Sequence, residues 1–103
     1  LIDYLPDVRP VPYGHIGDGN IHFNVCPPSN YNPETFLQKT DEIREIVYGN
    51  AFNFGGSFAA EHGVGIIKKK QMLKYKDKVE LQLMKDIKSF LDPKNILNPG
   101  KIF

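Results

Sequence analysis

Two histidines lie close together near the start of this sequence, on either side of a strong turn signal. His15 and His22 fall within the stretch Gly14–Asn24, and the intervening Asp18-Gly19 pair is typical of hairpin turns. A two-residue loop at Asp18-Gly19 would place the two histidines directly opposite each other on an antiparallel pair. Directly opposed residues have Cβ atoms roughly 4.5–5.5 Å apart. The two imidazoles could therefore bind one metal ion.

A carboxylate and the third histidine stand side by side at Glu61 and His62. With His15 and His22, Glu61 makes a set of two histidines and one carboxylate, which suits zinc, iron or manganese and leaves positions open for substrate. We expect His62 to act as a general base, because imidazole titrates near neutrality. Spacing alone also allows the plainer interpretation that these histidines are ordinary surface or hydrogen-bonded residues.

Regular elements must position these side chains, and the first half of the chain predicts several. We expect hairpin arms over Tyr13–Ile16 and Asn20–Cys26. Val8–Tyr13 contains two prolines, so a strand there belongs at a sheet edge. An asparagine N-cap and a proline at the first helical position predict a helix over Pro33–Asn50. Ser57–Glu61 is predicted to be a short strand.

The second half of the chain predicts two helices and a docked tail. The first helix is expected over Ile66–Tyr75, and the second begins after Asp77, which is spaced from Glu80 as in a capping box. Asp92-Pro93 ends it, and the apolar tail Asn95–Phe103 is expected to contact the rest of the chain. The predicted buried face of the second helix comprises Val79, Leu83, Met84, Ile87, Phe90 and Leu91.

The composition is that of an ordinary globular domain and excludes several functional classes. The chain has 103 residues, 41% hydrophobic and 24% charged, with a net charge of +1. The lysines at positions 68–70 predict a solvated helix face, so we expect no nucleic-acid partner. A single cysteine, Cys26, cannot form an internal disulfide, which favours a reducing compartment. No apolar run approaches the roughly 18–20 residues that span a bilayer.

Taken together, the motifs from Pro12 to Phe103 resemble the C-terminal part of FAD-linked oxidases of the vanillyl-alcohol oxidase type. The most similar members are the D-2-hydroxyglutarate dehydrogenases, D-lactate dehydrogenases and glycolate oxidase D subunits. The motifs that carry the resemblance are, in order, Gly14-His15-Ile16-Gly17-Asp18-Gly19-Asn20-Ile21-His22, Glu61-His62-Gly63-Val64-Gly65 with Lys68 or Lys69 shortly after, Leu91-Asp92-Pro93, and Ile96-Leu97-Asn98-Pro99-Gly100-Lys101.

This resemblance implies an α+β fold, with part of a ferredoxin-like antiparallel sheet, covering helices and a C-terminal helical segment. Residues 1–65 would be the remainder of a cap with the metal site, and residues 66–103 would return to an FAD-binding domain that this chain lacks. The family's divalent metal ligands match the two hairpin histidines and Glu61. His62 matches the residue that takes the substrate's hydroxyl proton, Asn24 a position near substrate and flavin, and Asn98 a turn toward the flavin domain.

The resemblance also implies an activity, in which a D-2-hydroxy acid is oxidised to a 2-oxo acid and hydride passes to FAD. An electron-transfer flavoprotein or a quinone would accept the electrons. A homodimer is a further expectation. The expected location is the cytoplasm, or the mitochondrial matrix in a eukaryote. We expect the fragment alone to be inactive. The alternative is a non-catalytic module that binds a metal or another ligand. A flavoenzyme for aromatic alcohols is disfavoured, because a chelated hydroxy acid is what a metal would help to bind.

Overall fold

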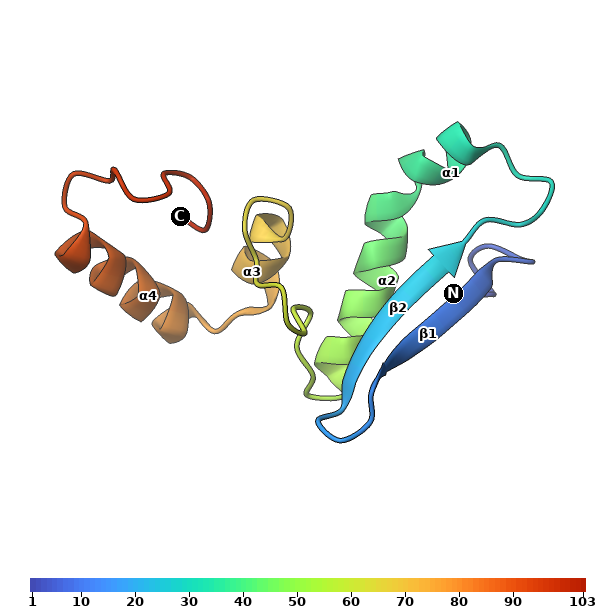
Figure 1. Ribbon diagram of the computed structural model, residues 1–103, viewed down its shortest axis with the longest axis horizontal. Helices are drawn as coiled ribbons and strands as arrows, with labels where there is room; N and C mark the ends of the chain where they lie inside the picture. Colours follow the sequence, from blue (N-terminus) through green and yellow to red (C-terminus); the bar gives the residue numbers. More distant parts are fainter. The chain divides into compact units, whose positions relative to one another are not determined.

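A computed structural model describes residues 1–103 and confirms the α+β class (Figure 1). The chain divides into two compact units, Leu1–Glu61 and His62–Phe103. No helix combines the length and apolar character needed to cross a membrane. The elements in chain order are β1 (Arg9–His15), β2 (Asn20–Cys26), α1 (Pro33–Gln38), α2 (Thr40–Asn53), α3 (Lys69–Tyr75) and α4 (Lys78–Leu91).

In the first unit, β1 and β2 form a two-stranded antiparallel sheet. The residues of β2 are those predicted. The two segments expected before the turn, Val8–Tyr13 and Tyr13–Ile16, instead form the single strand β1, which leaves out Val8 and Ile16. Pro10 and Pro12 are tolerated in β1 because this strand has a hydrogen-bonded neighbour on one side only.

The helix predicted over Pro33–Asn50 is interrupted at Lys39, so the prediction of one continuous helix was wrong. Its start is as expected, since the side chain of Asn32 accepts hydrogen bonds from the first turn of α1. At the interruption the hydroxyl of Thr40 donates to the carbonyl oxygen of Leu37 at 2.6 Å. A side chain that binds the backbone in this way competes with helix continuation.

The segment predicted as the strand Ser57–Glu61 has no regular secondary structure. No strand pairs with it, and the hydroxyl of Ser57 instead bonds to the backbone of Ala59. Local bonds of this kind offer the backbone an alternative to a sheet ladder. Glu61, at the end of the first unit, is therefore carried by an irregular segment that other contacts must fix in place.

In the second unit, α3 begins at Lys69 rather than Ile66, after a turn in which the Lys68 N–H donates to the Val64 carbonyl oxygen at 3.2 Å. α4 begins as predicted, with the Asp77 side chain accepting from the N–H groups of Val79 and Glu80. The prediction of which α4 residues are buried was largely wrong.

Five of the six residues expected on that buried face are exposed, Phe90 to 85%. Leu81, which was not expected there, is the buried apolar residue of α4. The amphipathic pattern of the helix is real, but little of the second unit lies over its apolar face. The face is therefore left as an exposed apolar surface.

Asp92 fixes the C-terminal tail to the end of α4, which agrees with the prediction that the tail contacts the rest of the chain. Its buried carboxylate accepts from the N–H groups of Ile96 and Leu97, both at 2.9 Å, and from the ammonium group of Lys88. Lys88 also donates to the Leu97 carbonyl oxygen at 2.6 Å. The hydrogen bond from Lys88 lowers the pKa of the Asp92 carboxyl; burial raises this pKa, and the two backbone donors lower it again.

The lowered pKa of Asp92 predicts a specific loss of stability in acid. Above the ordinary aspartate pKa of 3.8 the carboxylate is ionised in both the folded and the unfolded state, so its stabilising contribution is complete. As pH falls below that value the unfolded chain takes up the proton first, and the contribution is lost through the lower folded pKa. Asp92→Asn should flatten this part of the curve of unfolding free energy against pH, measured by urea denaturation.

The control for this experiment is Asp86→Asn, which changes an exposed carboxylate within α4. This control should keep the acid limb of the unchanged protein. An Asp92→Asn variant with that same acid limb would contradict the role assigned to Asp92.

Candidate metal centre

The hairpin places His15 and His22 on one face of the sheet, in a register that differs from the one predicted. His22 lies opposite Tyr13, and His15 lies opposite Asn20, so the prediction of directly opposed histidines was wrong. The connecting loop runs from Ile16 to Gly19 instead of consisting of Asp18 and Gly19 alone.

The physical reason for the wider loop is the backbone at Asp18. A type I′ turn needs positive φ at both central residues, but only Gly19, with φ of 69°, has it. The Asp18 carboxylate instead accepts from the N–H of Asn20 at 3.3 Å.

The change of register keeps the two histidines on the same face. A slip of one residue would send one side chain to the other face, whereas the observed difference is two residues and preserves it. His15 and His22 become diagonal neighbours, a spacing that long or aromatic side chains can bridge. Their ring centroids are 6.2 Å apart, and the Tyr13 ring stacks on His22 at 4.9 Å with an interplanar angle of 6°.

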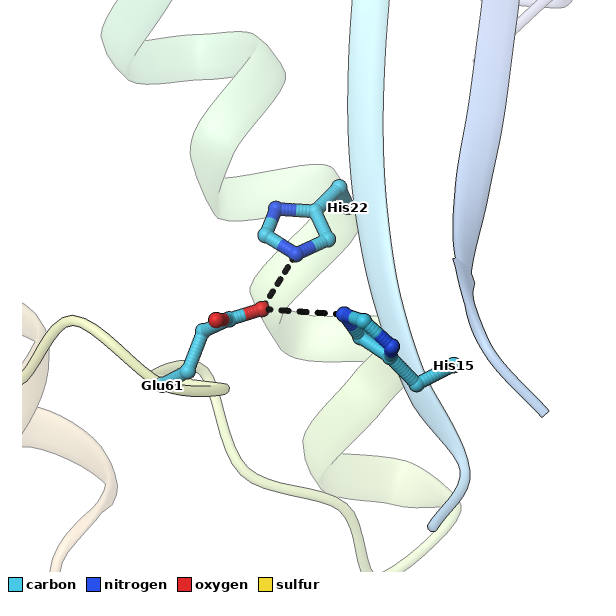
Figure 2. A group of neighbouring side chains, drawn as sticks. All are labelled: His15, His22 and Glu61. Atoms are coloured by element: carbon cyan, nitrogen blue, oxygen red, sulfur yellow. Dashed lines mark hydrogen bonds and ion pairs between the residues drawn. The ribbon is translucent and has the colours of Figure 1, made fainter. Parts of the chain in front are cut away.

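Glu61 reaches these histidines from the segment that follows α2, as Figure 2 shows. Its Oε1 atom lies 3.8 Å from Nε2 of His15 and in close contact with Nε2 of His22. One ligand atom from each of the three residues can be chosen so that all lie within 4.8 Å of one another. The sequence thus anticipated residues that the structure brings together.

The chemistry and exposure of this group fit a divalent cation. Two imidazole nitrogens and a carboxylate oxygen are ligands that zinc, iron and manganese accept, with further positions free for other ligands. The side chains of His15, His22 and Glu61 are 64%, 24% and 38% exposed, so solvent and small molecules can reach the site.

The other predicted site residues lie nearby in sequence or in the second unit. Asn24 is exposed on β2, two residues beyond His22 and so on the same face of the strand. His62 is exposed and is the first residue of the second unit. Asn98, also in that unit, has φ of 48° and begins a turn in which its carbonyl oxygen accepts from the N–H of Lys101. The roles of these three residues stay predictions.

Sequence reasoning missed one residue of this group, Asn20. Its side-chain amide nitrogen donates to Oε1 of Glu61 at 3.1 Å. The signal that could have found it is its position two residues before His22, which places it on the histidine face of β2.

Comparison with known proteins now identifies the family. Residues 3–102 match the family described as FAD linked oxidases, C-terminal domain. The D-2-hydroxyglutarate dehydrogenase of Xanthomonas citri pv. viticola is 41% identical over 103 residues, which is 100% of this chain and 22% of that relative. That of Stutzerimonas stutzeri is 38% identical over 98% of this chain and 22% of the relative.

A D-lactate dehydrogenase of Anaerostipes hadrus is 36% identical over 93% of this chain and 20% of its own length. The chain belongs to the family of C-terminal domains of FAD-linked oxidases. It spans about a fifth of the length of these relatives. The family resemblance inferred from the motifs is confirmed.

The close approach of the strands at Gly14 generates a test of the hairpin geometry. A Cβ atom there would overlap the carbonyl oxygen of Asn20 and come within 3.0 Å of the Ile21 Cα. Gly14→Ala should destabilise the first unit by about 1–3 kcal/mol in urea unfolding, and should weaken the cross-strand nuclear Overhauser effects between β1 and β2.

Gly17→Ala is the matched control, because a Cβ atom at Gly17 meets nothing within 4 Å. This loop variant should keep both the stability and the cross-strand contacts. Equal effects of the two substitutions would argue against the observed strand register.

Proposed function

We propose that this chain supplies the metal-binding and substrate-binding part of an FAD-dependent dehydrogenase that oxidises a D-2-hydroxy acid to a 2-oxo acid. The single observation that carries the proposal is the convergence of His15, His22 and Glu61 within a chain of this family. Three relatives of this chain are named as D-2-hydroxyglutarate or D-lactate dehydrogenases, which supports a D-2-hydroxy acid as the substrate class.

In the proposed site, His15, His22 and Glu61 hold a zinc, manganese or iron ion. Such an ion supplies a Lewis acid for the hydroxyl and carboxylate oxygens of the substrate. The open side of the site admits a small chelating acid, because two of the three ligand side chains are more than one third exposed. A substrate held through both oxygens has one defined orientation, which fixes the face of C2 that the flavin meets.

The proposed reaction separates a proton and a hydride from the hydroxy acid. His62, as a neutral imidazole, takes the hydroxyl proton on a ring nitrogen, and the electrons of the O–H bond form the carbonyl group. The hydride leaves C2 for FAD held by another domain, and electrons then pass to an electron-transfer flavoprotein or a quinone. Asn24 and Asn98 would contact the substrate or the flavin.

Metal binding tests the ligand assignment directly. The experiment uses the protein that carries this chain together with an FAD-binding domain. His22→Ala and Glu61→Gln should each weaken Mn²⁺ or Zn²⁺ binding by more than ~100-fold. The loss of a metal ligand should cost more affinity than the loss of a residue that only hydrogen-bonds to a ligand. Calorimetric titration of the chelator-treated protein measures this. Unchanged metal affinity in both variants would refute the proposed site.

His62→Ala should give a contrasting result, because His62 is proposed to move a proton rather than bind metal. We expect normal metal content by elemental analysis with kcat lowered by about 10²–10⁴-fold. Loss of metal from this variant would make His62 a ligand instead, and full activity would remove it from the reaction.

A further inference from the structure

Asn20 joins the two parts of the chain that form the metal centre. It is the first residue of β2 and lies directly opposite His15 in the hairpin. Its backbone N–H donates to the Asp18 carboxylate, and its side-chain amide nitrogen donates to Oε1 of Glu61 at 3.1 Å. The side chain therefore connects the end of the turn to a residue 41 positions later in the chain.

The orientation of the Asn20 amide follows from charge. A carboxylate only accepts hydrogen bonds, so an amide that contacts Glu61 must present its NH₂ group; a flipped amide would set two acceptors against each other. With NH₂ directed at Glu61, the Oδ1 atom of Asn20 is buried and lacks a hydrogen-bond partner. The contact to the carboxylate is thus the side-chain hydrogen bond that this amide makes.

Glu61 needs such support because it comes from a segment without regular secondary structure. Oε1, the oxygen that accepts from Asn20, is also the oxygen nearest both histidine Nε2 atoms. A ligating carboxylate that is held by a hydrogen bond presents its oxygen to the cation without first losing rotational freedom. We infer that Asn20 is a positioning residue, which aligns the Glu61 carboxylate for the metal ion proposed above, and this inference rests on that proposed function.

Two substitutions at Asn20 distinguish positioning from direct ligation, with Co²⁺ as the probe for calorimetry and visible absorption. Asn20→Ala removes the donor, and Asn20→Asp keeps the shape while placing a second negative charge beside Glu61. Positioning predicts a loss of Co²⁺ affinity of about 10–100-fold for both, with an altered cobalt absorption spectrum. An Asn20→Asp variant that keeps or strengthens Co²⁺ binding would overturn the inference and make Oδ1 a ligand.

Controls separate this role from a purely structural one. Asn30→Ala changes an exposed asparagine in the turn after β2, outside the candidate site, and in the Co²⁺ titration it should leave the affinity unchanged. If Asn20→Ala lowers the unfolding temperature but leaves the Co²⁺ affinity and spectrum unchanged, the residue is structural and the inference is wrong.

A measurement without metal keeps this inference distinct from the proposed function. In the metal-free protein, the side-chain NH₂ resonances of Asn20 should shift clearly when Glu61→Ala removes their acceptor. Absence of that shift overturns the positioning role even if the unchanged protein binds metal. If the NH₂ resonances shift but the protein binds no metal, the metal centre is refuted. The conclusion that Asn20 aligns Glu61 would still stand.

Discussion

The candidate site depends on one constraint, the pairing register of β1 with β2. This register places Tyr13 against His22 and His15 against Asn20, and so decides which side chains share the exposed face. It requires a glycine at position 14, where the backbones approach too closely for a Cβ atom. Because the side-chain period of a strand is two, a slip of one residue would separate the two histidines and remove the site altogether.

One part of the candidate site lies on regular secondary structure, and the other part lies on an irregular segment. The histidines stand on paired strands, whereas Glu61 arrives on a segment that makes no ladder hydrogen bonds. The amide of Asn20 and the imidazoles hold that segment against the hairpin. A cation at this point would tie together residues remote in sequence, so metal binding and the order of the Glu61 segment are expected to be coupled.

The second unit is held together by a different set of interactions. Its local order comes from helix capping by Asp77 and from the buried carboxylate of Asp92, which gathers the tail against α4. Most of the apolar residues of α4 remain exposed, in a chain that covers about a fifth of its relatives' length. His62 and Asn98 belong to this unit, so their proposed roles depend on how it meets the rest of the protein.

The sequence by itself determined whatever depends on near neighbours in the chain. The caps at Asn32 and Asp77, the bounds of β2 and the end of α4 before Pro93 follow from side-chain hydrogen bonds and backbone restrictions acting over a few residues. The choice of ligand types at the candidate site also came from residue chemistry.

Only the tertiary structure decided the loop length and register, the irregular path to Glu61, the contact from Asn20 and the exposure of α4. Each of these depends on a partner distant in sequence, because a strand needs another strand to pair with and an apolar face needs a surface to cover it.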